Sequence, residues 1–532
     1  MAPVPSAPYG FGGMIRLGDM ITRAARMAGD APALTCGAHA LTWRQVETRC
    51  WRVARALRDM GTAPGDRVAY LGLNSHRYFE CYFLPSRIGA ISVPLNIRYA
   101  PPELAAVVQG CAPHVLIADR AHWDLARQMQ QLAGIPHLVF ADDGPAPDGA
   151  PGYDDLAAGD GPDDGADIDA LGSQSDDTFI LFYTGGTTGH PKGVMLTHAN
   201  LFANTQGGIP LYGFKEHEVQ MLSGPMFHLG SGSRVFTAAY LLHHTVIVPK
   251  FDPVAAMETI QAHGIATVQM VPTMLAMLLE HPDFARYDLS SVRLVTYGAA
   301  VMPQALLARV MEALPGIAFC QGFGMTECSP LVTALTPDQH YVGSATLGTI
   351  GRPAPHVDLR IVDDRDRDVP PGTTGEILTR GPHVMKGYWN QPALTARALR
   401  GGWYHTGDAA WQESDGFVHL AGRTVEMIVT GGENVYPVET ENALALHPAV
   451  AEAAVVGLPD PRWGERVHAV VRLKPGQSAS ASDLTEFCRA RVAGYKLPRS
   501  FTFRDTPLPL THVNKVDKAR LKREAAELAI TA

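Results

Sequence analysis

Short apolar runs typical of buried β-strands alternate with segments of helical periodicity along most of this 532-residue chain. Strand-like runs include "DRVAYLGL", "FILFYT", "TVQMVP" and "RLVTYG", and residues 41–60 carry apolar side chains at helical spacing, with Thr42 as the expected N-cap. Such alternation is typical of parallel sheets, because a parallel connection crosses back over the sheet, usually through a helix. The pattern therefore predicts an α/β fold with substantial parallel sheet.

The composition is that of an ordinary globular protein, and it argues against several classes of function. The net charge of −9 and the scarcity of basic runs argue against nucleic-acid binding. Seven cysteines, an odd number with no C-x-x-C pair, argue against a disulfide framework or a zinc site and favour the cytoplasm. The apolar stretch at residues 264–279 is interrupted by polar residues and proline, so it predicts a strand and a helix and no transmembrane segment.

The pattern changes twice along the chain, which predicts more than one domain. Beyond about residue 343 short strands separated by turn residues predict a β-rich subdomain, and from 423 onward strands and helices predict a compact α+β unit. We expect a large N-terminal domain of packed mixed sheets and helices at residues 1–422 and a small C-terminal domain at 423–532. Residues 142–176, rich in Gly, Asp, Ala and Pro, are expected to form a surface connection.

The segment "YTGGTTGHPKGVMLTH", residues 183–198, predicts a phosphate-binding loop. Glycines let backbone N–H groups approach an anion, threonines add hydroxyls, and Lys192 adds a positive charge. The loop is not a Walker A motif, because Lys192 lies between proline and glycine and the following residues predict a second strand. The residues expected to contact phosphate are Thr184, Gly185, Gly186, Thr187, Thr188, Gly189 and Lys192.

The same segment resembles the signature loop of the adenylate-forming superfamily, which includes acyl-CoA synthetases, adenylation domains of peptide synthetases and firefly-type luciferases. Other motifs of that superfamily follow in order: "TYGAA", "QGFGMTE", "YHTGD", "GRTVEMIVTGGENVYPVE" and "LPLTHVNKVDK". The likeness covers nearly the whole chain and is strongest to the acyl-CoA synthetase branch, in particular to enzymes like 4-coumarate–CoA ligase.

The resemblance implies a role for individual residues. Lys515 would be the catalytic lysine, and Glu327 and Thr184 would hold Mg²⁺. Thr326 would bind phosphate, and His228 would lie near the substrate carboxyl. Asp408 would bind the ribose hydroxyls, and Arg423 would contact ribose or phosphate. The remaining residues implied to bind ATP or the thiol are Gly298, Ala299, Ala300, Gln321, Gly322, Phe323, Gly431 and Gly432.

The resemblance also implies a two-step reaction that uses ATP, Mg²⁺ and coenzyme A. A carboxylate first attacks the α-phosphate of ATP to give an acyl-adenylate and pyrophosphate, and a thiol then displaces AMP. The C-terminal domain would rotate between the two steps about a hinge at Val425, where relatives usually carry Lys or Asp. Asn514 replaces the glycine that usually precedes the catalytic lysine.

The acyl pocket is expected from the segment "PMFHLGSGSR", residues 225–234, which matches the superfamily loop that leads into the acyl site. Gly230 and Gly232 would leave the pocket open, and apolar residues nearby would favour an alkanoate or aryl-alkanoate. Those apolar residues are Val301, Met302 and Met325.

The predicted function is an ATP-dependent acyl-CoA synthetase for a medium- or long-chain fatty acid or an aryl-alkanoic acid. The alternatives are a hydroxycinnamate (feruloyl or coumaroyl)–CoA ligase, an enzyme that loads an acyl carrier protein, a luciferase-like monooxygenase, and an inactive nucleotide-binding protein. The expected partners are the small-molecule acid and coenzyme A, with a homodimer left open. The presence of Lys192, Glu327, Asp408, Arg423 and Lys515 argues against the inactive alternative.

Overall fold

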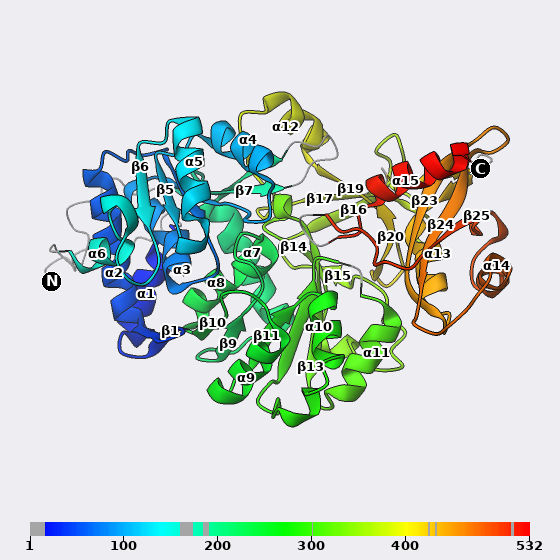
Figure 1. Ribbon diagram of the computed structural model, residues 1–532, viewed down its shortest axis with the longest axis horizontal. Coiled ribbons are helices and arrows are strands. Elements are labelled where there is room, and N and C mark those ends of the chain that lie inside the picture. The colour runs from blue at the N-terminus through cyan, green and yellow to red at the C-terminus, as the bar shows by residue number, and fades with distance from the viewer. Residues whose placement is uncertain are drawn as a thin grey trace, which may run out of the picture.

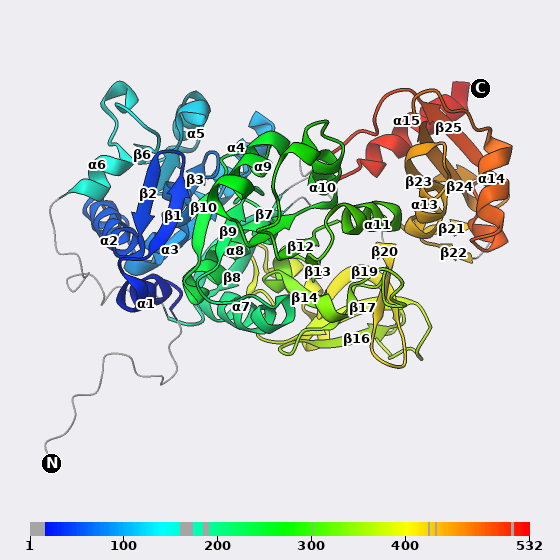
Figure 2. The same ribbon diagram turned by 90° about the horizontal axis from the view of Figure 1, so that it is seen from below.

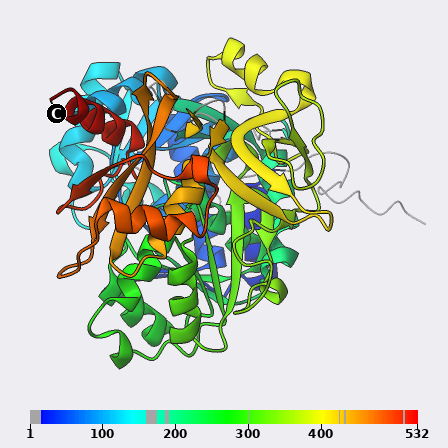
Figure 3. The same ribbon diagram turned by 90° about the vertical axis from the view of Figure 1, so that its right-hand side faces the viewer.

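The computed structural model describes residues 16–159, 174–184, 191–300, 302–423, 426–430, 433–511 and 515–531. Figure 1 shows a large unit, coloured blue through yellow, and a small C-terminal domain in orange and red beside it. Figure 3, viewed from the side of the small domain, shows that domain in front of the large unit. The predicted α/β class, with a large domain of mixed sheets and a smaller C-terminal domain, is confirmed.

The first sheet of the large unit is mainly parallel, with antiparallel strands at both edges. Its order in the described residues is β15-β14-β13-β12-β11-β9-β10-β1-β2. The strands are β1 (Pro32–Cys36), β2 (His39–Thr42), β9 (Val219–Leu222), β10 (His244–Ile247), β11 (Thr267–Met270), β12 (Leu294–Gly298), β13 (Ala318–Gly324), β14 (Leu331–Leu335) and β15 (Arg352–Pro353). Strands β12 and β13 run parallel, so both end at the same edge of the sheet.

The second sheet combines parallel strands with an antiparallel extension that contains the phosphate-loop hairpin. Its order is β18-β8-β7-β4-β3-β5-β6, and β7–β8 and β8–β18 are antiparallel. The strands are β3 (Arg67–Leu71), β4 (Ile91–Pro94), β5 (Val115–Ala118), β6 (His137–Phe140), β7 (Thr178–Thr184), β8 (Lys192–Thr197) and β18 (Gly387–Tyr388).

Helices fill the space between the two sheets and cover their outer faces (Figures 1 and 2). The middle layer, packed against both sheets, contains α1 (Asp19–Ala28), α2 (Trp43–Asp59), α3 (His76–Phe83), α7 (His198–Tyr212) and α8 (Leu229–Leu241). The outer helices of the second sheet are α4 (Pro101–Cys111) and α5 (Trp123–Ala133), and those of the first sheet are α9 (Pro253–His263), α10 (Pro272–Leu279) and α11 (Gln304–Ala313). Phe236 of α8 contacts the rings of Tyr82 in α3 and Phe179 in β7, so the middle layer joins the sheets into one core.

Two smaller sheets complete the molecule. The β-rich subdomain contains β16 (Asp358–Val362), β17 (Gly375–Arg380), β19 (Tyr404–Gln412) and β20 (Val418–Arg423), and α12 (Pro392–Ala398) lies next to β18. The C-terminal sheet contains β21 (Ile428–Thr430), β22 (Glu433–Val435), β23 (Val450–Asp460), β24 (Gly464–Leu473) and β25 (Ser500–Arg504), with α13 (Pro437–Ala445), α14 (Ala481–Arg489) and α15 (Lys518–Thr531). The division at residues 422 and 423 stays a prediction.

Local sequence explains why α2 begins where it was predicted. Thr42 is the N-cap: its hydroxyl accepts from the backbone N–H of Gln45 at 3.3 Å, and the Gln45 side chain accepts from the backbone N–H of Thr42 at 2.8 Å. This capping box satisfies N–H groups that the first helical turn leaves without partners.

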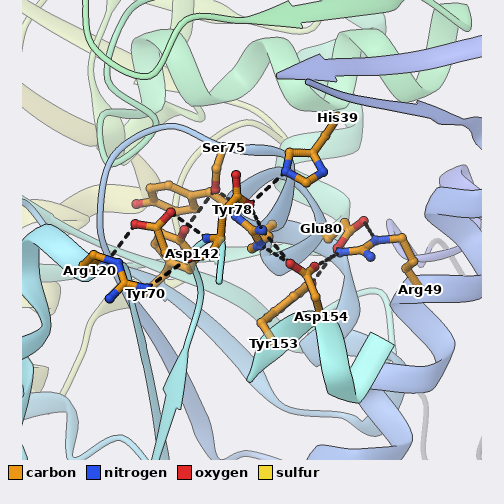
Figure 4. Close-up of polar contacts among 12 residues, drawn as sticks. His39, Arg49, Tyr70, Ser75, Tyr78, Glu80, Arg120, Asp142, Tyr153 and Asp154 are labelled. Carbon is orange, nitrogen blue, oxygen red and sulfur yellow. Dashed lines mark hydrogen bonds and ion pairs between the residues drawn. The ribbon is translucent and has the colours of Figure 1, made fainter. Parts of the chain in front are cut away.

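The expected surface connection at residues 142–176 is wrong in part, because it contains a short helix, α6 (Tyr153–Ala158). Tyr153 is fully buried and donates to Glu80, and Asp154 accepts from Arg49 at 2.9 Å (Figure 4). Burial opposes ionisation of Asp154, but hydrogen bonds from Arg77 and Arg49 outweigh it and lower its pKa to about 2. These long-range charge pairs, which local composition cannot reveal, hold α6 against α2 and α3.

Candidate active site

The predicted phosphate loop connects two paired strands, as expected. Strands β7 and β8 form an antiparallel hairpin in which Thr184 pairs with Lys192. A strand and no helix follows Lys192, which agrees with the exclusion of a Walker A motif. The loop residues Gly185, Gly186, Thr187, Thr188 and Gly189 lie outside the described residues, so their role stays a prediction.

Tyr388 brings Lys192 and Glu327 together. Strand β18 pairs with β8, and this places the Lys192 Nζ 5.5 Å from the centroid of the Tyr388 ring. The Tyr388 hydroxyl donates to Glu327 Oε1 at 3.0 Å. Burial and the nearby Glu327 charge raise the pKa of Tyr388, so the hydroxyl stays protonated and able to donate. No local pattern in the sequence indicates this role for Tyr388, because the contact depends on the pairing of β18 with β8, nearly 200 residues apart in the chain.

Thr326 and Glu327 lie just beyond β13, in a turn of 3₁₀-helix at Thr326–Cys328. Ligands of α/β sheets often bind at the carboxyl ends of parallel strands, and this turn follows such an end. Glu327 Oε2 accepts no hydrogen bond from the described residues, so one carboxylate oxygen remains available to a cation. Mg²⁺ typically binds one or two protein carboxylates together with phosphate oxygens, so Glu327 fits the predicted metal role.

The predicted adenine segment ends β12 beside β13. Gly298 pairs with Gly322, and a Cβ at Gly298 would lie 2.3 Å from the Gly322 carbonyl oxygen, so only glycine fits there. Ala299 follows with a φ of +64°, a left-handed conformation that is unfavourable for alanine. Gln321, Gly322 and Phe323 belong to β13, and Ala300 follows Ala299 at the same sheet edge.

Asp408 and Arg423 form an ion pair between adjacent strands. They are cross-strand partners on β19 and β20, and Arg423 Nε lies 2.6 Å from Asp408 Oδ1. Asp408 is buried while Arg423 is exposed. Burial raises the pKa of Asp408 to about 6, although the charges of Arg423 and Lys515 lower it.

Lys515 of the small domain is an electrostatic neighbour of this pair. Desolvation and the Arg423 charge lower the pKa of Lys515, while Asp408 and Glu426 oppose that change. Lys515 remains solvent-accessible, yet enough protein surrounds it for desolvation to act. The Thr511 N–H donates to the Lys515 carbonyl at 2.7 Å, and the Lys515 N–H donates to the Thr511 hydroxyl at 3.3 Å. The described residues between β25 and α15 extend from the small domain toward the large one (Figures 1 and 2). Asn514 lies outside the described residues.

The expected acyl pocket is only partly supported. His228 is the N-cap residue of α8, and its ring centroid lies 5.5 Å from that of Phe227. A Cβ at Gly230 would meet one atom, at 4.0 Å, so there is space beside this residue. Gly232 does not open the pocket, because a Cβ there would lie 2.1 Å from the Tyr82 hydroxyl.

The two methionines expected in one apolar wall of the pocket lie in separate parts of the hydrophobic core. Met302 packs with α9, α10 and α11, whereas Met325 packs against the middle layer. Val301, Val425, Gly431 and Gly432, which were predicted to contribute to the pocket, hinge and thiol tunnel, lie outside the described residues.

Two family models match this chain, one over most of the large unit and one over part of the small domain. An AMP-binding enzyme match spans residues 21–389, and an AMP-binding enzyme C-terminal domain match spans residues 439–515. The chain belongs to the AMP-binding enzyme family. The predicted adenylate-forming superfamily is thereby confirmed, and the chain is an AMP-forming acid–thiol ligase of the acyl-CoA synthetase type, a class that uses ATP, Mg²⁺ and coenzyme A.

Similar proteins extend over almost the whole chain. A feruloyl-CoA synthase from Amycolatopsis sp is 38% identical over 95% of this chain and 98% of its own length. An indoleacetate–CoA ligase from Aromatoleum aromaticum is 36% identical over 96% of this chain and 98% of its own. The anthranilate CoA ligase AuaEII, solved with anthranoyl-AMP, has a TM-score of 0.87 and 29% identity, with 98% of both chains covered. No helix in the described ranges is long and apolar enough to cross a membrane.

Proposed function

We propose that this chain joins an aryl-substituted carboxylic acid to coenzyme A through an acyl-adenylate. The observation that carries the proposal is the position of Lys515 beside Asp408 and Arg423, because it adds a positive charge from the small domain to the predicted ribose site. The aryl class is supported by the names of three similar proteins, a feruloyl-CoA synthase, an indoleacetate–CoA ligase and an anthranilate CoA ligase.

Each charged residue has a distinct part in the proposed reaction. Lys515 stabilises the charge that develops where the substrate carboxylate meets the α-phosphate, and Lys192 holds the departing pyrophosphate. Asp408 accepts hydrogen bonds from the ribose hydroxyls, and Arg423 keeps it ionised and oriented. Bound Mg²⁺, held through Glu327 and Thr184, would neutralise phosphate oxygens. His228 lies next to the acyl carboxyl, and the thiol of coenzyme A takes the acyl group in the second step.

A panel of carboxylic acids tests this assignment. We expect cinnamic, hydroxycinnamic, phenylacetic and indoleacetic acids to support ATP–pyrophosphate exchange, and to support AMP release when coenzyme A is added. Exchange with fatty acids alone would contradict the aryl class, and AMP release with acyl carrier protein alone would favour the carrier-loading alternative. Failure of every aryl acid would contradict the proposed substrate class.

We also propose a cytoplasmic location, because all seven cysteines are free, as a reducing compartment would keep them. A homodimer stays a prediction.

Tyr388 is proposed as a positioning residue for Glu327. Removing its hydroxyl in Tyr388→Phe leaves Glu327 without that donor, and a hydrogen bond to a charged group contributes about 1.5–3 kcal/mol. We expect ATP–pyrophosphate exchange to fall by about tenfold and to need more Mg²⁺ for half-maximal rate.

The matched control is Tyr240→Phe, which removes a tyrosine hydroxyl that accepts from Gln206 at an exposed position. This control should leave the Mg²⁺ dependence as in the wild type. An unchanged Mg²⁺ dependence in Tyr388→Phe would contradict the positioning role.

A further inference from the structure

Arg234 is a buried arginine that forms no ion pair with a carboxylate of the described residues. It lies on α8 with 8% of its surface exposed. By contrast, the similarly buried Arg77 and Arg87 pair with Asp154 and Glu47. A buried charge without a counter-charge is unfavourable, so the position of Arg234 needs an explanation.

The contacts of Arg234 are neutral and incomplete. Its Nη2 donates to the Thr296 hydroxyl at 2.9 Å, and its guanidinium carbon lies 4.8 Å and 4.5 Å from the ring centroids of Tyr212 and Phe214. Its Nε is buried and has no acceptor. Burial lowers the pKa of Arg234, but arginine keeps its charge in proteins, so a donor remains without a partner.

Gln269 provides a complementary unsatisfied group, on the strand next to that of Thr296. Gln269 and Thr296 are partners in the parallel β11–β12 ladder, so their side chains lie on the same face of the sheet. The Gln269 Nε2 donates to the Gly230 carbonyl at 2.6 Å, which fixes the orientation of the amide because a carbonyl can only accept. The other amide atom, Oε1, is buried and has no donor.

Both groups lie along the helix that begins at the predicted acyl site. Gly230 and Arg234 are four residues apart on α8, so they lie on one face, and the space beside Gly230 is open. Arg234 follows His228 by six residues, or about 9 Å of helix axis. An acid whose carboxyl lies near His228 and whose chain runs along this face of α8 has its far end near Arg234 and Gln269.

We propose that Arg234 and Gln269 form a recognition site for a hydroxyl group at the far end of the acyl substrate. A hydroxyl both accepts and donates, so it can accept from Arg234 and donate to Gln269 Oε1, whereas a carboxylate could only accept. The inference rests on the proposed function for its acyl site and specifies the substrate as a hydroxy-substituted acid. Arg234 and Gln269 are then specificity residues.

Binding measured by calorimetry without ATP tests this site independently of adenylation. The probes are 4-hydroxycinnamic acid and 4-methylcinnamic acid, which differ in hydrogen bonding more than in size, with 10-hydroxydecanoic and undecanoic acids as an aliphatic pair. We expect the wild type to bind the hydroxy acid of at least one pair 10- to 100-fold more tightly than its methyl analogue. Arg234→Met and Gln269→Leu should each reduce that ratio to near one, and Arg234→Lys should retain part of it.

The control Arg309→Met removes an exposed arginine of α11 and should leave the ratio unchanged. A wild type without hydroxyl preference in either pair, or a preference that persists in both Arg234→Met and Gln269→Leu, would overturn the proposal. A large drop in the melting temperature of Arg234→Met with an unchanged ratio would also overturn it and make Arg234 a packing residue. Absence of ATP–pyrophosphate exchange is a separate result, which contradicts the proposed function.

Discussion

Replacing Lys515 with alanine is expected to slow acyl-adenylate formation about 100- to 1,000-fold. The first half-reaction brings two anions together, and Lys515 adds a charge to the site that contains Asp408 and Arg423. In the second half-reaction AMP leaves as the thiol attacks, and the domain rotation predicted from the superfamily resemblance would remove Lys515 from the site. Lys515→Ala should therefore still convert supplied acyl-adenylate and coenzyme A to the thioester at a rate near that of the wild type.

The two half-reactions are measured separately, by ATP–pyrophosphate exchange and by thioester formation from synthetic acyl-adenylate. Lys522→Ala is the matched control, because Lys522 lies on α15 and pairs with Glu465 at the surface. It should leave both rates unchanged. Loss of both half-reactions in a folded Lys515→Ala variant would show that the lysine is not confined to adenylation.

Features determined by neighbouring residues could be predicted from the sequence. The Thr42 N-cap depends on a residue three positions away, and the hairpin at Lys192 depends on a glycine-rich sequence between two apolar strands. The order of the adenylate-forming motifs predicted that Asp408, Arg423 and Lys515 serve one site, and the structure brings these three together.

Features determined by distant residues could not be predicted. Helix α6 has a composition typical of a loop, and charge pairs with α2 and α3 stabilise it. Gly230 and Gly232 look alike in the sequence, yet only the space beside Gly230 is open.

Dependence on distant residues also explains why the sequence did not indicate the polar groups of Arg234 and Gln269 near the predicted acyl pocket. Methionines near the motifs predicted an apolar pocket, but the pairing of β11 with β12 places Gln269 next to Thr296, whose hydroxyl accepts from Arg234. Side chains that become neighbours through sheet register leave no periodic signal in a single sequence.

Asp408 gives a prediction about pH. Its pKa of about 6 lies above the usual value near 4, so between these values the folded state holds a proton that the unfolded state has lost. Stability therefore falls as pH rises through this window, by about 3 kcal/mol once Asp408 is ionised. Asp408→Asn should consequently not unfold the protein near neutral pH. A buried carboxylate that costs stability when ionised fits a binding role.

Adenosine is the ligand that measures this role, because it carries the ribose hydroxyls without a phosphate that titrates near the same pH. We expect the affinity of the wild type for adenosine to fall as pH decreases from 8 to 5, with a midpoint near 6, since protonated Asp408 loses acceptor capacity. Asp408→Asn should bind adenosine about 10- to 100-fold more weakly at pH 8 and show little pH dependence. The control Asp358→Asn, at an exposed carboxylate of β16 that pairs with Arg380, should behave as the wild type.

The same titration shows whether Lys515 lies beside the ribose site in solution. The Lys515 charge lowers the pKa of Asp408, so Lys515→Ala should move the midpoint of adenosine binding to higher pH. This shift requires no catalysis, so it separates the position of Lys515 from its role in adenylation. An unshifted midpoint in Lys515→Ala would mean that the small domain spends little time in the arrangement of Figure 1, because a lysine held elsewhere cannot change the ionisation of Asp408.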